Sequence, residues 1–182
     1  PFDSFSFSRR DFSIGIGDST FSRRGIELAL DDDGHRFGGS VAFEDVADFP
    51  RTIASPGIMG WYRYVPGMEC YHGVVSMDHA LRGELLFDGE RIDLSGGRGY
   101  IEKDWGTSFP SSWIWMQSNS FGTPGVSLML SIARIPWFGR HFTGFLSFLR
   151  TPDGLVRCAT YTGASIERLE VYMRQHFDLL DL

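Results

Sequence analysis

The chain has 182 residues, of which 42% are hydrophobic and 22% charged, and this composition excludes a disordered protein and favours one domain with a substantial core. A net charge of -6, with no stripe of basic residues, excludes a typical nucleic-acid-binding surface. No apolar run approaches the roughly 20 residues that span a bilayer, and no signal peptide opens the chain. We therefore expect a soluble cytoplasmic protein.

Aromatic residues and cysteines constrain the interior. Sixteen Phe and five Trp are many for this length, so they predict either an aromatic core or a cavity lined by rings. The two cysteines, Cys70 and Cys158, form no disulfide framework and lack the spacing of a metal site. We expect both to be buried free thiols.

The first half of the chain alternates apolar and polar residues as β-strands do. Phe5 to Phe7 and Phe12 to Ile16 predict two short strands. Gly25 to Leu30 then runs into the turn sequence of residues 31–34. Within Leu85 to Leu94, the Asp88-Gly89 pair is typical of a tight hairpin.

The second half continues this pattern. Val126 to Ala133 and Phe142 to Leu149 predict two strands, and a turn at residues 151–154 leads into Leu155 to Tyr161. Such spacing predicts a single all-β domain, an antiparallel barrel or sandwich. After Ser165, a candidate N-cap, apolar residues recur at helical spacing and predict a C-terminal helix over residues 166–180.

The sequence WIWMQSN, residues 113–119, carries the first candidate site. On a strand, Trp113, Trp115, Gln117 and Asn119 share one face. A packed core rarely accepts two carboxamides in line with indoles, because each buried amide needs partners, whereas a ligand cavity does. The alternative is a solvent-facing amide row, and spacing alone does not decide between the two.

The preceding segment, YIEKDW, adds carboxylates. Tyr100, Glu102 and Asp104 share one strand face, and Lys103 and Trp105 belong to the other. A carboxyl group desolvated by aromatic surface can act as a general acid near neutral pH. The alternative is that Lys103 and an arginine pair with both acids at the surface.

Residues 59–79 set ionisable groups among large apolar ones. Glu69, His72 and His79 lie there, with Trp61 and Tyr71 among the aromatic residues. His72 and His79 are seven apart, which on a strand puts them on opposite faces, so a shared metal ion is not expected. Each histidine is interpreted as a hydrogen-bonded structural or pocket residue. No nucleophile elbow, phosphate-binding loop, dinucleotide fingerprint or zinc signature occurs.

Two stretches carry a resemblance to a known family. IMGWYRYVPGMECYHGVVSMDH and GGRGYIEKDWGTSFPSSWIWMQSN resemble the tocopherol cyclase-like family, and the likeness extends from about Phe12 to Ala164. It implies a lipocalin-like β architecture that encloses an apolar cavity. Family members are longer, which implies that residues 1–182 are one β-domain of a two-lobed architecture. The family pattern has His where this chain has Ser120.

The resemblance also implies a reaction. Tocopherol cyclases close a chromanol ring on a prenylated quinol: a proton adds to the alkene, and the phenolic oxygen captures the tertiary cation. The step has no redox change, so neither a cofactor nor a metal ion is expected. On this basis Asp104, Glu102 or Glu69 delivers the proton, and His72 accepts the phenolic proton. The expected substrate-binding residues are Tyr100, Trp105, Trp113, Trp115, Gln117, Asn119, Tyr71 and Trp61.

Two other functions fit the same pocket. A lipocalin-like carrier or sensor would hold an apolar isoprenoid without chemistry, and it would need only apolar walls. A related isomerase or hydratase would use the same protonation step on another terpenoid. In every case the expected partner is a hydrophobic small molecule and not a nucleic acid, and peripheral contact with a lipid surface is a further hypothesis.

Overall fold

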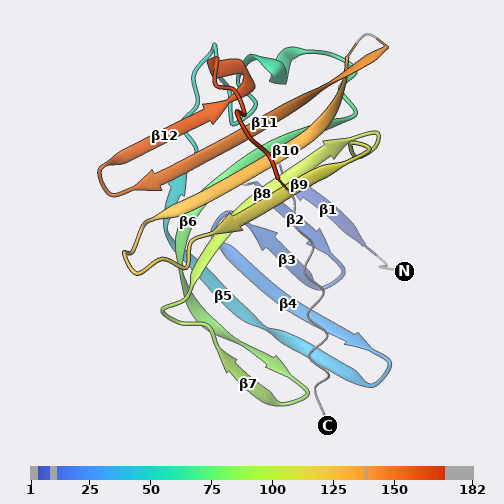
Figure 1. The fold of residues 1–182 in the computed structure, drawn as a ribbon. Helices are drawn as coiled ribbons and strands as arrows, with labels where there is room; N and C mark the ends of the chain where they lie inside the picture. Colours follow the sequence, from blue (N-terminus) through green and yellow to red (C-terminus); the bar gives the residue numbers. More distant parts are fainter. Residues whose placement is uncertain (1–3, 9–11, 138, 171–182) are drawn as a thin grey trace, which may run out of the picture.

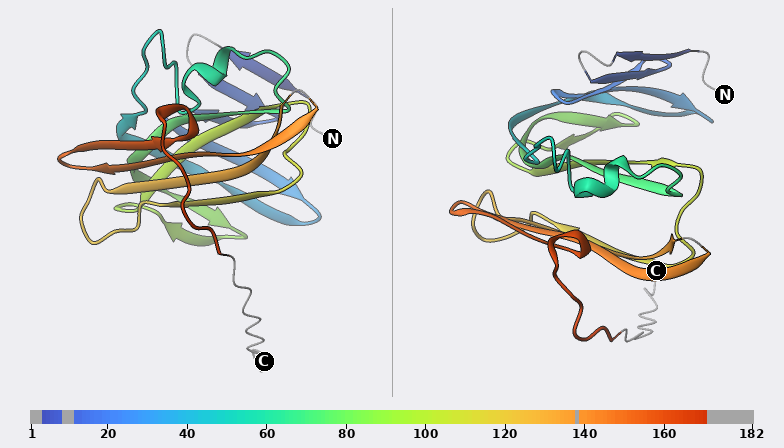
Figure 2. Two further views of the ribbon diagram at one scale, coloured as in Figure 1. Left: turned by 45° about the horizontal axis from the view of Figure 1, so that its top comes forward. Right: turned by 90° about the horizontal axis from the view of Figure 1, so that it is seen from above.

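Two antiparallel β-sheets stack as layers and make up most of the molecule (Figures 1 and 2). The computed structural model describes residues 4–8, 12–137 and 139–170. The eight-stranded sheet A contains β1 (Phe5–Ser8), β2 (Ser13–Ile16), β3 (Ser19–Ser22), β4 (Gly25–Asp32), β5 (His35–Asp48), β6 (Cys70–Phe87), β7 (Glu90–Asp93) and β8 (Arg98–Gly106). The four-stranded sheet B contains β9 (Trp113–Ser118), β10 (Ser127–Trp137), β11 (Arg140–Thr151) and β12 (Gly154–Ala159). Two short 3₁₀ helices, η1 (Gly60–Tyr64) and η2 (Thr160–Thr162), complete the described elements.

Sheet A is organised around the 18-residue strand β6. Strands β1 to β7 pair in sequence order, each antiparallel to the next. The first half of β6 pairs with β8 and its last residues pair with β7, so β7 and β8 follow one another along β6 at the end of the sheet opposite to β1. Register shifts along β5 and β6 mark bulges, which increase the local twist of a sheet.

Two glycines allow β5 and β6 to approach closely where the sheet curls. Gly39 has φ of 125° and Gly83 has φ of 133°, a region that side chains with a Cβ rarely adopt. A Cβ on Gly39 would collide with the carbonyl oxygen of Glu84, and one on Gly83 with that of Ser40. The predicted all-β antiparallel fold is therefore confirmed, as a curled sheet facing a second one.

The turn chemistry read from the sequence matches the hairpins. Asp88 and Gly89 have φ of 49° and 89° and connect β6 to β7 as predicted. The segment through Pro136, expected as a connection between strands, instead continues β10 as far as Trp137, where it pairs with Arg140.

Two other expectations have different outcomes. The expected C-terminal helix lies mostly outside the described residues, and its described part, residues 166–170, is not helical. Cys70 and Cys158 are free thiols as predicted. The expected burial is wrong for Cys158, which is exposed near the end of the short edge strand β12, and Cys70 is only partly buried.

The core lies between the two sheets and is mostly aliphatic. Its buried members are Phe49, Ile58, Met59, Val74, Met77, Met129 and Phe148. The two phenylalanine rings meet edge to face at 5.8 Å between centroids. Most of the other aromatic side chains therefore lie outside this core, where they can line a pocket or the molecular surface.

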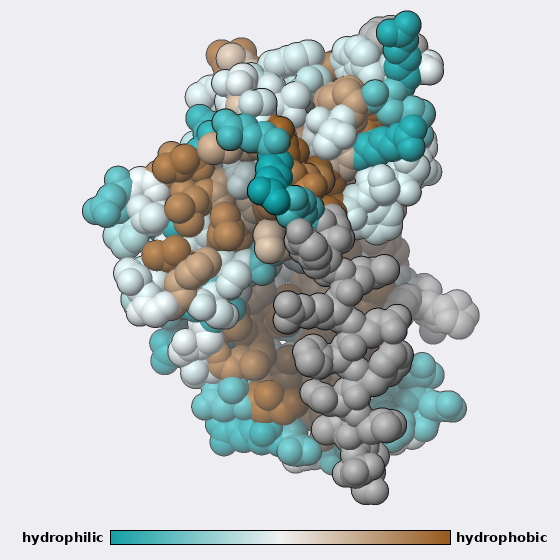
Figure 3. Space-filling view, in the orientation of Figure 1, coloured by the Kyte–Doolittle hydropathy of each residue, from teal (hydrophilic) through white to brown (hydrophobic). Residues whose placement is uncertain are grey.

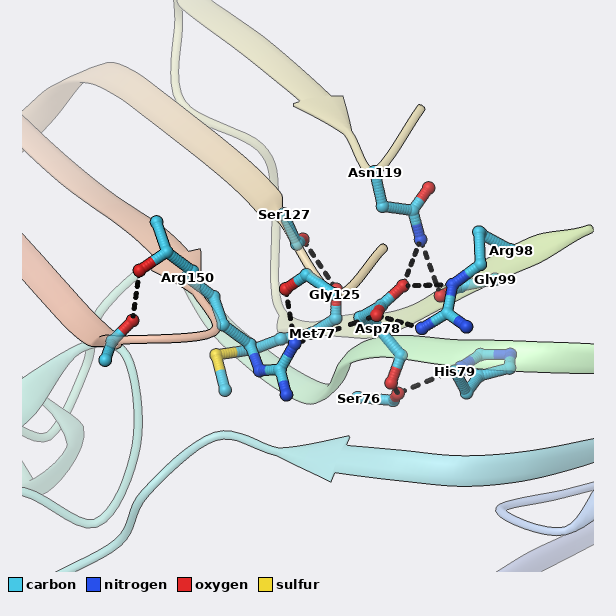
Figure 4. A network of polar contacts seen from close by, with 12 residues as sticks. Ser76, Met77, Asp78, His79, Arg98, Gly99, Asn119, Gly125, Ser127 and Arg150 are labelled. Carbon is cyan, nitrogen blue, oxygen red and sulfur yellow. Dashed lines mark hydrogen bonds and ion pairs between the residues drawn. The ribbon is translucent and has the colours of Figure 1, made fainter. Parts of the chain in front are cut away.

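A buried ionic network joins the sheets at one end of the core (Figure 4). Asp78 on β6 is 1% exposed, and its carboxylate accepts hydrogen bonds from both Nε and Nη2 of Arg98 on β8. From the other layer, Asn119 Nδ2 donates to Asp78 at 3.2 Å, and Arg150 Nη1 lies 3.7 Å from the same carboxylate. Ser127 Oγ also donates to the Met77 carbonyl at 2.6 Å. One carboxylate thus collects donors from β6's own sheet and from the opposite one.

The outer face of sheet B carries exposed apolar side chains. Met116 on β9 and Val156 on β12 are about half exposed, and Figure 3 shows hydrophobic residues gathered on the surface of the molecule on the side of this sheet. Within the described part of the chain, no helix has the length and apolar character needed to cross a membrane.

The Asp78 network should dominate the cohesion of the two sheets. Replacing Asp78 by Asn leaves the Arg98 and Arg150 guanidinium groups without their counter-charge, and we expect the free energy of unfolding to fall by about 3 kcal/mol. The matched control is Asp48→Asn, which removes the exposed Arg23–Asp48 pair and should cost less than about 1 kcal/mol. Urea unfolding followed by circular dichroism measures both, and equal losses would contradict the assignment.

Candidate active site

A pocket of about 270 Å³ opens between the two sheets. β6 and β8 contribute Cys70, His72, Glu102 and Asp104 to one wall, and β9 contributes Trp113 and Trp115. Residues from β10, β11 and the segment before β6 close the apolar remainder, including Met59, Tyr62, Met68, Ile135, Phe142 and Leu146. The result is an open apolar pocket with a few polar groups on one wall, the usual form of a small-molecule site.

The polar wall is built around His72. β6 pairs with β8 so that His72 lies opposite Asp104 in the ladder. Nδ1 of His72 lies 2.6 Å from Oδ1 of Asp104, and its Nε2 lies 3.3 Å from Oε2 of Glu102. The second contact is an ion pair without hydrogen-bond alignment, so Nε2 has no hydrogen-bond partner among the described residues. One imidazole is thus held between two carboxylates, with one ring nitrogen unbonded.

These carboxylates control the charge of His72. Burial lowers the pKa of His72, but the hydrogen bond to Asp104 and the negative charges of Asp104 and Glu102 outweigh burial and raise the pKa to about 9. The imidazole is therefore protonated at neutral pH. The side chain is 10% exposed, so this proton is held largely away from bulk water.

Two further side chains orient Glu102. The hydroxyl of Tyr100 donates to Oε2 of Glu102 at 2.6 Å, and Nε1 of Trp115 donates to the same oxygen at 3.3 Å. Burial and the adjacent Glu102 carboxylate raise the pKa of Tyr100, which keeps its hydroxyl protonated as a donor. Tyr100 itself does not line the pocket, so its role is to orient the Glu102 carboxylate by a hydrogen bond from outside the pocket.

The indole and amide side chains on one face of β9 do not all contribute to the same site: the indoles line the pocket, and Asn119 belongs to the Asp78 network. Trp113 and Trp115 line the pocket and are about half exposed at its mouth, where Trp113 lies 5.7 Å from the Phe109 ring. Gln117 is partly buried, and its Nε2 has no hydrogen-bond partner in the described chain. Asn119 binds Asp78 and the Gly99 carbonyl instead, so its expected contact with substrate is replaced by a structural role.

Trp105 and Tyr71 lie on the other side of the sheet. Their rings stack at 5.6 Å, and neither lines the pocket. Strand alternation explains this, because Trp105 has the parity of Lys103 and not that of Glu102 and Asp104. The expected contact of Trp105 with a cation in the pocket is therefore wrong, and the Tyr71 hydroxyl donates to the Val65 carbonyl.

The remaining predicted residues, Glu69 and Trp61, also lie outside the pocket lining. The carbonyl of Glu69 accepts hydrogen bonds from Thr107 and Ser108, so it anchors the loop that precedes β9. Trp61 is 47% exposed, and its ring packs at a tilt against Tyr62 with 4.2 Å between centroids. It is Tyr62, and not Trp61, that faces the pocket.

His79 proves to be a structural residue. It is buried, lies 2.9 Å from Ser76 Oγ through Nδ1, and packs on Phe43. Burial lowers its pKa, so it stays neutral at neutral pH. The predicted hydrogen-bonded character is confirmed, and His79 takes no part in the His72 cluster.

Sequence reasoning missed the apolar wall of the pocket. Tyr62, Met68, Ile135 and Phe142 line it from three separate segments. The strand patterns at residues 126–133 and 142–149 indicated apolar faces, but nothing in the pattern shows which face meets the pocket.

The same three polar side chains have the spacing of a metal site. One ligand atom each from His72, Glu102 and Asp104 can be chosen so that all lie within 4.8 Å of one another. A divalent ion there would compete with the proton on His72, because the ring nitrogen that binds a metal ion must first lose its proton. The arrangement can hold either a proton or a metal ion.

The charge of His72 predicts how stability depends on pH. Because its folded pKa of about 9 lies above the unfolded value near 6.5, its stabilisation is complete below pH 6.5 and is lost as pH rises through 9. The difference in unfolding free energy between wild type and His72→Gln should shrink by about 1.4 kcal/mol per pH unit between these values. Urea unfolding at pH 6, 7.5 and 9 measures it, and a difference independent of pH would contradict a protonated His72.

Known proteins share this part of the chain. The model of the family described as tocopherol cyclase-like matches residues 40–135, more than half of the chain. A chloroplastic tocopherol cyclase from Zea mays is 34% identical over 73 residues, which are 40% of this chain and 15% of that protein. A probable chloroplastic tocopherol cyclase from Oryza sativa subsp. japonica is 31% identical over 82 residues, 45% of this chain and 17% of that protein.

The matched stretches therefore span less than a fifth of the length of either relative. No solved structure matches the chain. The family match covers β6, β8 and β9, which carry His72, Glu102, Asp104 and both pocket tryptophans. The chain belongs to the tocopherol cyclase-like family.

Proposed function

We propose that this chain cyclises a prenylated quinol to a chromanol in the pocket between the sheets. The observation that carries the proposal is the protonated His72 held between Glu102 and Asp104 on the wall of an apolar, aromatic pocket. A carrier needs only apolar walls. Here the two carboxylates keep His72 protonated, although burial by itself would lower its pKa. The names of the two plant relatives point to the same reaction.

The proton cycle balances within the Asp104–His72 pair. The Asp104–His72 pair gives its proton to the less substituted alkene carbon, where the π electrons form the new C–H bond. The tertiary carbon is left as a cation, and a lone pair of the phenolic oxygen closes the C–O bond. The phenolic proton then returns to His72, so no external base, oxidant or reductant is consumed.

The groups around the cluster favour the cationic intermediate. Tyr100 and Trp115 both donate hydrogen bonds to Glu102, and these bonds orient its carboxylate beside His72. The indoles of Trp113 and Trp115 offer cation–π attraction, worth about 0.5–2 kcal/mol each. The unbonded amide nitrogen of Gln117 lies on the same strand face as these indoles. Gln117 does not line the pocket, so as the proposed donor to a quinol oxygen its side chain has to turn toward the pocket.

The dimensions of the pocket indicate how a long substrate would bind. Its volume of about 270 Å³ lies at the lower limit of sites that enclose a whole drug-sized ligand, which are roughly 300–1,000 Å³. The quinol ring and the first prenyl unit would occupy it, and the rest of the tail would leave through the mouth. Phe109 and Trp113, 62% and 57% exposed at that mouth, would contact the tail or a lipid surface that delivers it.

Two broader expectations remain predictions. One is that residues 1–182 are one lobe of a two-lobed architecture. The other is a cytoplasmic location, although both plant relatives are named as chloroplastic.

The proposal predicts a loss of turnover without a loss of binding when the proton-donating pair is changed. Asp104→Asn should lower kcat for a prenylated quinol at least 100-fold, because it removes the carboxylate that holds the proton on His72. The dissociation constant of the quinol should change less than about threefold. Chromanol formation is measured as a chromatographic shift without a change of mass, across a panel of prenylated quinols.

The matched control is Asp153→Asn, which removes a carboxylate from the exposed turn between β11 and β12 and should keep wild-type turnover. Full activity of Asp104→Asn would remove Asp104 from the mechanism. If a lipid copurifies with the wild type but no quinol is converted, the chain is a carrier.

The proton mechanism also predicts the response to metal ions. Chelation with EDTA should leave cyclase activity unchanged, and added Zn²⁺ should inhibit it by replacing the His72 proton between the two carboxylates. Inhibition should strengthen as pH rises toward 9, because the competing proton becomes easier to remove. Activity that is lost in EDTA and restored by a divalent ion would show that the cluster works through a metal.

A further inference from the structure

A second pocket, of about 230 Å³, adjoins the proposed active site, and His72 and Met59 line both pockets. Lys103 and Trp105 reach it from β8, on the strand face opposite to Glu102 and Asp104. Arg51 and Arg63 reach it from the segment that connects β5 to β6. Phe12 adds a second ring. Three cationic side chains and two aromatic rings therefore surround one hollow.

Two of the three cations, on Arg63 and Lys103, lie close to the ring of Trp105. The guanidinium carbon of Arg63 lies 4.4 Å from the Trp105 ring centroid, and Nζ of Lys103 lies 4.8 Å from the same centroid. Lys103 is also 5.8 Å from the Phe12 ring. These contacts hold both cations at the pocket that Trp105 lines.

Nothing in the described chain neutralises these charges. None of Arg51, Arg63 and Lys103 forms an ion pair with a described carboxylate, whereas Arg91 and Arg98 each do. The protein as a whole carries a net charge of -6, so acidic groups are plentiful elsewhere. Three like charges around one hollow repel one another, and an anion bound among them would relieve that repulsion.

We propose that this second pocket binds a phosphate group. Two guanidinium groups can each offer paired N–H donors to phosphate oxygens, and an ammonium group adds a point charge. Three positive charges match the charge of a phosphate monoester better than that of one carboxylate. The phosphate belongs either to a soluble compound or to a lipid headgroup, and Trp105 and Phe12 would contact the carbon atoms next to it. His72 lines both pockets, but no step of the proposed cyclisation uses this phosphate.

Lys103 provides a direct reporter because it is the only lysine in the sequence. Acetylation of its amine by an N-hydroxysuccinimide ester can be followed by peptide mass spectrometry, which separates it from the N-terminal amine. Inorganic phosphate should slow this acetylation at least about fivefold at saturation, compared with chloride at equal ionic strength. Arg51→Gln and Arg63→Gln should each raise the phosphate concentration for half-protection about tenfold or more.

Two variants separate binding from folding. Arg51 makes no described hydrogen bond or ion pair, so its loss leaves the cation–π contacts of Arg63 intact. Arg140→Gln removes an exposed arginine that does not line this pocket, and it should retain wild-type protection. If phosphate and chloride protect Lys103 equally, or if protection survives Arg51→Gln and Arg63→Gln, the site does not exist.

Vesicles distinguish the two sources. Phosphatidylcholine vesicles that contain phosphatidic acid should protect Lys103, and pure phosphatidylcholine vesicles should not, if the phosphate belongs to a lipid. Protection by inorganic phosphate but by neither kind of vesicle assigns a soluble phosphate compound. Protection by neither phosphate nor vesicles overturns the proposal.

Discussion

The buried Asp78 carboxylate is the constraint on which the rest of this structure depends. A buried charge is stable only when donors surround it, and its donors come from β8 in one layer and from the ends of β9 and β11 in the other. Those bonds fix how the two sheets are stacked (Figure 4). Because strands are stiff over a few residues, fixing this end also sets the spacing at the other end, where the pocket opens.

The same three strands carry the network and the candidate active site. β6 holds Asp78 and, six residues earlier, His72. On β8, Arg98 and Asp104 are also six residues apart, and so are Trp113 on β9 and Asn119 just after it. Antiparallel pairing of β6 and β8 brings the two ends into register. The conspicuous GGRGYIEKDWGTSFPSSWIWMQSN stretch therefore combines the support of the pocket with its chemistry.

Sequence patterns predicted the local structure well, and they predicted the site only in part. Turn residues such as Asp88-Gly89 and the alternating apolar positions gave the strands, because those signals are local. Glu102, Asp104 and His72 were identified, but their meeting depends on the register of β6 against β8, which bulges shift. Asn119 was assigned to substrate because its true partner, Asp78, lies 41 residues away. Trp105 was assigned to the pocket, although its strand parity already put it with Lys103.

The central claim is that the His72 cluster puts a proton on carbon, and turnover in deuterium oxide tests it most directly. The proton on His72 exchanges with solvent before each cycle. The chromanol formed from a prenylated quinol should therefore carry one deuterium on a ring carbon next to the new C–O carbon, located by mass spectrometry and NMR. A chromanol formed without carbon-bound deuterium would contradict protonation of the alkene, and the account of the site with it.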